Sequence, residues 1–148
     1  MRKTCILAIL VVGLVFVAGC ARFQPPRGVT PQVKTILVTG YCRCGSCCSW
    51  KRDWLFRPVY SSGSLKGKPK KIGITASGTR ARKGTIAADT SKYPFGTIMY
   101  IEGYGYGCVE DRGGAIKGEH IDLYFRTHKQ ALEWGKRKKR VKVWLPKK

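Results

Sequence analysis

Acidic residues are scarce in this chain. It has 148 residues, of which eight are Asp or Glu against 29 Lys or Arg, and its formal net charge is +21 at pH 7. Such a balance implies an acidic partner, for which nucleic acid is the usual candidate. Three of the few carboxylates, Asp89, Asp111 and Asp122, lie in the least polar and most strand-like stretches. Because burying an unpaired carboxylate costs several kcal/mol, these stretches suggest a carboxylate site built on strand ends.

The chain also lacks an apolar run of the roughly 20 residues that a membrane-spanning helix needs. The one candidate, Cys5 to Val17, is shorter, follows a basic start and runs into small residues before Cys20. This pattern predicts a lipoprotein signal peptide over residues 1–19 rather than an uncleaved anchor. Two acyl signals on Cys20 would attach the mature chain stably to a membrane.

Export changes the expected partner. An exported lipoprotein meets little nucleic acid, so we expect anionic cell wall or lipid headgroups as the acidic partner and a location in the cell envelope. Ala21 after the cysteine favours the periplasmic face of the outer membrane if the cell is Gram-negative. The basic run at 136–140 resembles a nuclear localisation patch, but in this compartment we interpret it as a solvated turn.

The mature chain divides into a tether and one domain. Residues 20–33 begin with the lipidated cysteine and contain three prolines and a glycine, which predicts a flexible tether. Residues 34–148 are long enough for a single domain.

The domain shows strand patterns with little helix. Short β-branched and apolar segments separated by Gly and Pro turns predict six or seven short strands. These segments are Lys34–Tyr41, Ile72–Thr75, Thr85–Ala88, Thr97–Ile101, Cys108–Glu110, His120–Phe125 and Val141–Leu145. A capping box at Thr127 and Gln130 predicts one short helix that ends at Trp134, and residues 50–71 are expected to form a long loop. The fold class is therefore mainly β, as a small closed barrel.

Alternation within residues 120–125 separates two faces. Ile121, Leu123 and Phe125 suit a core. The other face then carries His120, Asp122 and Tyr124, so that Asp122 lies between an imidazole and a phenol.

Five cysteines remain after the signal peptide and the lipidated residue: Cys42, Cys44, Cys47, Cys48 and Cys108. In an oxidising compartment disulfides are the default, with one thiol left over, although a bridge between the adjacent Cys47 and Cys48 would be strained. The alternative is a metal site formed by Cys42, Cys44, Cys47 and Cys48, because C-x-x-C has ligand spacing. Neither interpretation makes a cysteine catalytic.

Several ordered motifs run through residues 77–144. They are SGT at 77–79, TIAAD at 85–89, PFGT at 94–97, DRGGAIKG at 111–118, HID at 120–122 and ALEWG at 131–135. Together they resemble the 3D (three-aspartate) domain family, and the Cys-rich segment 41–48 is similar to that of many 3D proteins. The same loop, with the pattern D-x-GGAIKG, and its closing aspartate also occur in membrane-bound lytic transglycosylase A, which looks like a relative.

The resemblance implies a double-psi β-barrel that cleaves peptidoglycan without hydrolysis and leaves 1,6-anhydro-muramyl ends. It places the catalytic aspartate at Asp122, the second motif aspartate at Asp111 and the first at Asp89. No cofactor is implied. The residues expected to contact the glycan are Thr79, Gly113, Gly114, Lys117, His120 and Tyr124.

The implied chemistry agrees with these residue types. Ordinary glycosidases need two carboxylates, but a lytic transglycosylase uses the sugar's own C6 hydroxyl as nucleophile, so one aspartate can act as acid and then as base. Asp122 would need a raised pKa, which apolar neighbours and the Asp111 carboxylate would supply. We expect Lys117 to point away from Asp122 or to bind substrate.

Three other interpretations stay open. In the first, Asp89, Asp111 and Asp122 are all structural and stabilise loops of the barrel. In a second, the domain is a non-catalytic barrel that binds peptidoglycan. The charge and the tether favour this binding domain about as well as they favour the enzyme. In a third, residues 42–48 form the centre of a metal or redox protein. The chain is too short for a second large domain that would form the other side of a substrate groove. A homodimer is one way to supply that second side.

Overall fold

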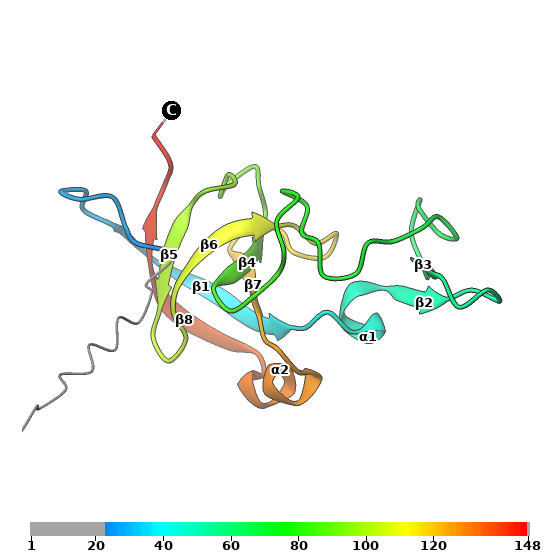
Figure 1. Cartoon of the computed structure of the whole chain (residues 1–148). Coiled ribbons are helices and arrows are strands. Elements are labelled where there is room, and N and C mark those ends of the chain that lie inside the picture. Colours follow the sequence, from blue (N-terminus) through cyan, green and yellow to red (C-terminus); the bar gives the residue numbers. More distant parts are fainter. Residues whose placement is uncertain (1–22, 148) are drawn as a thin grey trace, which may run out of the picture.

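The computed structural model describes residues 23–147, drawn in colour in Figure 1. The predicted signal peptide and the predicted lipidation site, Cys20, lie outside the described residues. Within residues 23–147, no helix has the length and apolar character needed to cross a bilayer.

Six strands close into a barrel in the spatial order β1-β7-β4-β6-β5-β8 (Figure 1). They are β1 (Gln32–Tyr41), β4 (Thr85–Ala88), β5 (Ile98–Ile101), β6 (Gly105–Asp111), β7 (His120–Tyr124) and β8 (Arg137–Trp144). β1 pairs in parallel with β7, and β4 in parallel with β6, while the other neighbours are antiparallel. The prediction of a mainly β, closed barrel is confirmed, and the arrangement is consistent with a small double-psi barrel.

The barrel interior is apolar because alternate residues of each strand point inward. On β7, Ile121 and Leu123 are fully buried, as the alternation predicted, and they pack with Ile36 and Val38 of β1. A second, smaller cluster, formed by Tyr41, Ala87 and Tyr124, covers the outer surface of the same strands. The barrel wall therefore has an apolar inner face and an outer face, and the outer face carries the polar residues of β7.

Helix α2 (His128–Trp134) packs against β1 outside the barrel. The predicted capping box is present: the Thr127 hydroxyl accepts from the Gln130 N–H at 3.2 Å, and the Gln130 side chain accepts from the Thr127 N–H at 3.3 Å. A second helix, α1 (Gly45–Cys48), is a single turn that the sequence did not predict. Residues 42–44 connect it to the end of β1.

Three predictions of secondary structure were wrong. Residues 50–71 are not a plain loop, because β2 (Trp50–Arg52) and β3 (Pro58–Tyr60) form a two-stranded sheet that stands apart from the barrel in Figure 1. Residues 72–75 make only a single bridge, between Ile74 and Arg80, because tight turns flank them. The basic run at 136–140 is not a turn.

That run instead starts β8. Arg137 to Arg140 pair with β1, from Val38 back to Thr35. Strand pairing holds their backbone, and their charged heads stay at the surface, with Arg137 and Lys139 at 5.3 and 5.6 Å from the Trp134 ring. The prediction of a turn from the run of basic residues was therefore wrong, because charged side chains are compatible with a strand whose backbone is paired.

Gly107 provides a test of the packing between β6 and β4. A Cβ at this position would lie 2.6 Å from the Gly84 carbonyl oxygen and 2.8 Å from the Ile86 side chain. We expect Gly107→Ala to lower the free energy of unfolding by about 1–3 kcal/mol, because the two backbones must move apart. Urea denaturation measures this change. Gly114→Ala, where a Cβ would meet nothing within 4 Å, is the matched control, and equal losses in both variants would contradict the assigned packing.

Candidate active-site cleft

A cleft of about 650 Å³ lies between the outer face of the barrel and the segment that carries α1, β2 and β3. The barrel side contributes Tyr41, Ala87, Asp111, Asp122 and Tyr124. The opposite wall includes Cys47, Cys48, Trp50, Tyr60, Leu65 and Lys70, and the ends are formed by residues 71–76 and 112–116. Two of the three motif aspartates are thus brought to one concave surface.

Strand pairing explains why Asp111 and Asp122 face the same cleft. Ala87 of β4 is the partner of Asp111 on β6 and also of Asp122 on β7. Two strand spacings separate the two Cα atoms by about 10 Å, with the small Ala87 side chain between them. The register of β4 against β6 shifts by one residue at this point, so Glu110 is the extra residue. Without this irregularity Asp111 would point into the barrel.

Asp122 is the carboxylate with the raised pKa. Burial is the main cause, the negative charge of Asp111 adds to it, and the net effect raises the pKa of Asp122 to about 6. Thr39, its partner on β1, opposes the shift by donating a hydrogen bond to Asp122 Oδ1 at 2.9 Å. The Thr39 hydroxyl also lies 2.9 Å from His120 Nε2, so it contacts both the carboxylate and the imidazole.

Asp111 is held by three donors. Its Oδ1 accepts from the N–H groups of Ala76 at 3.0 Å and Arg112 at 2.9 Å, and its Oδ2 accepts from the Tyr41 hydroxyl at 3.1 Å. Burial and the Asp111 carboxylate raise the pKa of Tyr41, so this phenol stays a donor. The contacts fix the orientation of Asp111 beside the cleft.

Asp89 has different surroundings and does not line the cleft. Its carboxylate accepts from the Gly118 N–H at 2.9 Å and from the Ser91 N–H and hydroxyl at 3.1 and 2.7 Å. These bonds, with Lys117 nearby, lower the pKa of Asp89 to about 2. The aspartate therefore connects the end of β4 to the loop that joins Asp111 and Asp122.

The predicted glycan contacts fall into two groups. Gly113, Gly114 and Tyr124 line the cleft. Thr79 does not, and its hydroxyl lies 2.9 Å from that of Thr75 in a turn. His120 lies 2.9 Å from the Thr39 hydroxyl that bonds Asp122, while Lys117 is exposed and its charge acts on Asp89.

Sequence reasoning missed several cleft residues. Thr39 and Tyr41, the hydrogen-bond partners of the two carboxylates, come from β1, and Trp50 comes from a segment predicted as loop. The only signal for Thr39 and Tyr41 was their position at the end of a strand. The parallel pairing of β1 with β7, which places Thr39 opposite Asp122, is a tertiary feature.

None of the five cysteines that the structure describes forms a disulfide. Cys42, Cys44 and Cys47 gather around His128 of α2, which the sequence analysis did not consider as a ligand. Cys48 is outside this group and donates its thiol to the Cys42 carbonyl at 3.1 Å. Cys108 is buried on β6 and is also outside the group.

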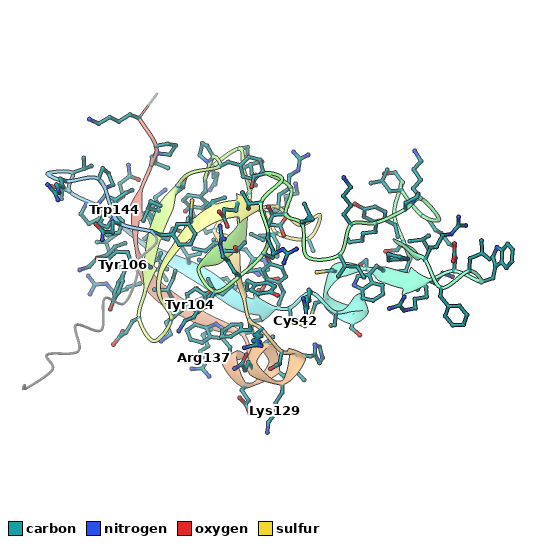
Figure 2. The ribbon with its side chains drawn as sticks, in the orientation of Figure 1. Cys42, Tyr104, Tyr106, Lys129, Arg137 and Trp144 are labelled. Carbon is teal, nitrogen blue, oxygen red and sulfur yellow. The ribbon has the colours of Figure 1, made fainter. Side chains whose placement is uncertain are left out.

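A second pocket, of about 760 Å³, adjoins the cleft and shares Arg43, Ala81 and Tyr124 with it. It has aromatic and basic walls: Tyr104, Phe125, Trp134, Arg82, Lys83, Arg126 and Arg137. Figure 2 shows Tyr104 and Arg137 at the end of the barrel nearer α2. Arg82 Nε and Trp134 Nε1 are buried here without a hydrogen-bond partner among the described residues. This pocket suits a ligand with acceptor groups.

Together the barrel and the cleft define a small β domain with a carboxylate-bearing surface groove. Residues 84–147, which contain all three motif aspartates, match the family model of the 3D domain. The resemblance to the 3D domain that the motifs predicted is thus confirmed for these residues.

Two relatives come from Bacillus subtilis (strain 168). The putative cell wall shaping protein YabE is 36% identical over 75 residues, which are 48% of this chain and 18% of the relative. The cell wall-binding protein YocH is 40% identical over 75 residues, covering 48% of this chain and 26% of the relative. The chain spans about a quarter or less of the length of these relatives.

Among solved structures, the chain is similar to MltA, a lytic transglycosylase of Escherichia coli. One MltA structure is 24% identical with a TM-score of 0.40, over 53% of this chain and 30% of MltA. A structure of MltA with bound chitohexaose gives 25% and a TM-score of 0.41, over 55% and 29%.

The environment of Asp122 predicts opposite pKa changes in two variants. Asp111→Asn should lower the pKa of Asp122 from about 6, because it removes a nearby negative charge. Thr39→Val should raise it, because it removes the hydrogen bond at 2.9 Å to Oδ1. Carboxyl-carbon NMR titration measures both. A shift in the same direction in the two variants would contradict the assigned causes.

The raised pKa also predicts a pH-dependent stability change. The folded chain binds the Asp122 proton more tightly than the unfolded chain, whose aspartate pKa is about 3.9. Stability therefore falls as the pH rises from about 4 to about 6. Asp122→Asn lacks this loss and should gain about 2 kcal/mol over the wild type between pH 4 and pH 8, measured by urea denaturation at both values. No relative gain would show that Asp122 titrates normally.

Proposed function

We propose that this protein is a lytic transglycosylase of peptidoglycan in which Asp122 is the acid and then the base. The observation that carries the proposal is the position of Asp122 in the cleft, where burial and Asp111 raise its pKa to about 6. A carboxyl with such a pKa is still partly protonated near neutral pH and can donate a proton. The relatives' names, which refer to cell wall shaping and binding, support a wall substrate.

The reaction needs one carboxyl and no water. Protonated Asp122 gives its proton to the oxygen that links C1 of N-acetylmuramic acid to the next sugar, and the C1–O bond breaks. The muramyl C6 hydroxyl then bonds to C1 and returns its proton to the Asp122 carboxylate. The products are a 1,6-anhydro-muramyl end and a free hydroxyl on the leaving sugar. Asp122 ends the cycle protonated, and no cofactor takes part.

Asp111 would stabilise charge in the transition state and would not transfer a proton. It lies across Ala87 from Asp122, and its three donors hold it in place. Its carboxylate would stabilise the positive charge that develops at C1. Asp89 would instead fix the loop 112–118, because its carboxylate accepts hydrogen bonds from Gly118 of that loop and from Ser91.

The glycan would lie between two walls of the same chain. The barrel provides one wall, and the other comes from Trp50 and Tyr60 of the β2–β3 sheet with Leu65 and Lys70. Aromatic side chains can stack on sugar rings. This second wall is the one for which the sequence suggested a homodimer. Dimerisation and attachment through Cys20 remain predictions.

A non-catalytic peptidoglycan-binding domain is the second candidate. The aromatic and basic pocket beside the cleft and the net charge of +21 favour it, because both suit a polyanionic wall. One relative is named as a cell wall-binding protein. Binding is also the first step of the enzymatic proposal, so turnover separates the two.

Incubation of the purified chain with peptidoglycan, followed by mass spectrometry, tests the proposal. We expect 1,6-anhydro-muropeptides from the wild type and a loss of at least about 100-fold in Asp122→Asn, since general acid catalysis contributes about 10²–10⁴-fold. Glu102→Gln, which removes an exposed carboxylate outside the cleft, should retain the wild-type rate. The wild-type rate should fall as the pH rises through about 6.

Each outcome has a distinct meaning. Sedimentation with peptidoglycan should be similar for the wild type and Asp122→Asn, because the substitution removes a proton rather than a wall contact. No product from the wild type, with sedimentation intact, would reject catalysis and leave the binding domain. Equal products from both proteins would reject Asp122 as the acid.

A further inference from the structure

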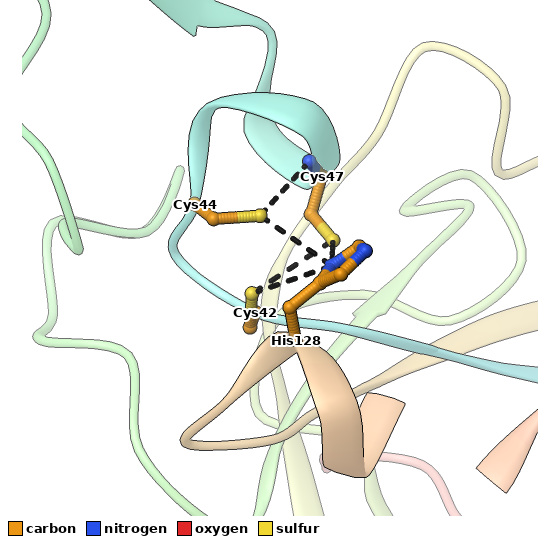
Figure 3. A group of neighbouring side chains, drawn as sticks. All are labelled: Cys42, Cys44, Cys47 and His128. Atoms are coloured by element: carbon orange, nitrogen blue, oxygen red, sulfur yellow. Dashed lines mark hydrogen bonds between the residues drawn. The ribbon is translucent and has the colours of Figure 1, made fainter. Parts of the chain in front are cut away.

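Three thiols and one imidazole converge where the end of β1 meets α1 and the start of α2 (Figure 3). His128 Nδ1 lies 3.3 Å from Cys47 Sγ, 3.6 Å from Cys44 Sγ and 4.0 Å from Cys42 Sγ. The Sγ atoms of Cys42 and Cys47 are 3.9 Å apart, and all four atoms lie within 4.8 Å of one another. Their side chains come from two segments about 80 residues apart in sequence.

The separations of 3.3–4.0 Å lie close to the ligand spacing around a tetrahedral zinc ion. Zn–S bonds of about 2.3 Å and Zn–N bonds of about 2.0–2.1 Å place tetrahedral ligand atoms about 3.5–3.8 Å apart. A disulfide needs about 2.05 Å between sulfurs, much shorter than the 3.9 Å between Cys42 and Cys47. We propose that Cys42, Cys44, Cys47 and His128 bind one zinc ion in a Cys3His site.

The ligand set differs from the four thiols of the sequence hypothesis. Cys48 follows Cys47 directly, and its thiol turns back to the Cys42 carbonyl at 3.1 Å. His128 takes the fourth position, at the first residue of α2. C-x-C-x-x-C followed by a distant histidine is a ligand combination that soft thiolates and imidazole make suitable for zinc.

The surrounding backbone holds the ligands in place. The Cys47 N–H donates to Cys44 Sγ at 3.4 Å, a bond that would stabilise a thiolate. The Cys48 N–H donates to the Cys44 carbonyl at 3.0 Å and closes the single turn of α1. On the other side, the Thr127 capping box fixes the start of α2 and with it His128. All four positions are filled by protein, which is the pattern of a structural site.

The zinc ion would join the cleft wall to the barrel. Helix α2 packs on β1, whereas residues 42–50 lead away from the barrel towards the β2–β3 sheet. Cys47 and Trp50 line the cleft, so a clip at Cys47 would set the position of that wall. Figure 2 shows Cys42 at this junction between barrel and α1. A zinc ion here would order the cleft wall whether or not the domain is an enzyme.

Metal analysis of the purified full-length chain tests the site. With growth in zinc-supplemented medium and purification without chelator, we expect one zinc per chain. His128→Ala and Cys44→Ser should lose at least tenfold in zinc affinity, measured by competition with a chromophoric chelator. Cys48→Ser is the matched control, because it removes a neighbouring thiol outside the group, and it should retain the wild-type affinity.

Cobalt provides the second readout. Replacing zinc with Co²⁺ should give the visible absorption of a tetrahedral thiolate site, with sulfur-to-cobalt charge-transfer bands that weaken in Cys44→Ser. His128→Cys should restore metal binding with a spectrum of four thiolates. This rescue separates a ligand role from a packing role of His128, since packing alone would not restore the spectrum.

Three results would overturn the proposal. The first is wild-type protein that contains no zinc and binds neither zinc nor cobalt after reduction. The second is equal loss of zinc in Cys48→Ser and Cys44→Ser. The third is an intact disulfide among Cys42, Cys44 and Cys47 in metal-free protein as isolated, detected by mass spectrometry without reductant.

Discussion

The pairing of Ala87 with Asp111 on one side and Asp122 on the other is the constraint on which the cleft depends. β4 is only four residues long, yet it is the strand between the two that carry carboxylates. The register shift at Glu110 turns Asp111 onto the same outer face as Asp122. A larger residue at 87 would fill the space between the two carboxylates. The closed barrel thus serves as a rigid base on which two acidic groups are held at a fixed spacing.

The two carboxylates differ because their surroundings differ. Asp111 receives three hydrogen bonds, two of them from backbone N–H groups, whereas Asp122 receives one from Thr39. Burial then dominates at Asp122 and raises its pKa, while hydrogen bonds dominate at Asp89 and lower its pKa. Three aspartates of one motif set are thereby given separate environments. Although the chain has a net charge of +21, Lys117 is among the causes of the lowered pKa of Asp89, whereas no basic side chain is among the causes of the raised pKa of Asp122.

Much of this arrangement followed from the sequence. The strand at 85–88 was predicted at its observed bounds, and the alternation of residues 120–124 gave the correct inward and outward faces of β7. Local patterns were sufficient there, because burial on one face and a capping box are encoded within a few residues. The barrel followed from the number and shortness of the strands, and the motif resemblance identified the 3D domain.

The missed features depend on contacts between distant segments. Thr39 reaches Asp122 only because β1 and β7 pair in parallel, and His128 reaches the cysteines only because α2 packs on β1. The register shift at Glu110 has no residue signature in the sequence. Residues 50–60 lacked a long strand pattern, since a two-stranded sheet of three-residue strands has little periodicity. The basic start of β8 was misread because pairing with β1 outweighed charge.

The central claim is that Asp122 serves a reaction in which the substrate's own hydroxyl replaces water. Digestion of peptidoglycan by the purified chain in ¹⁸O-labelled water tests this most directly. The account predicts 1,6-anhydro products that carry no ¹⁸O at the new muramyl ends, from the earliest time points. Muramyl ends that have gained one ¹⁸O would contradict it, because water would then be the nucleophile and a second carboxylate, Asp111, would have to activate it.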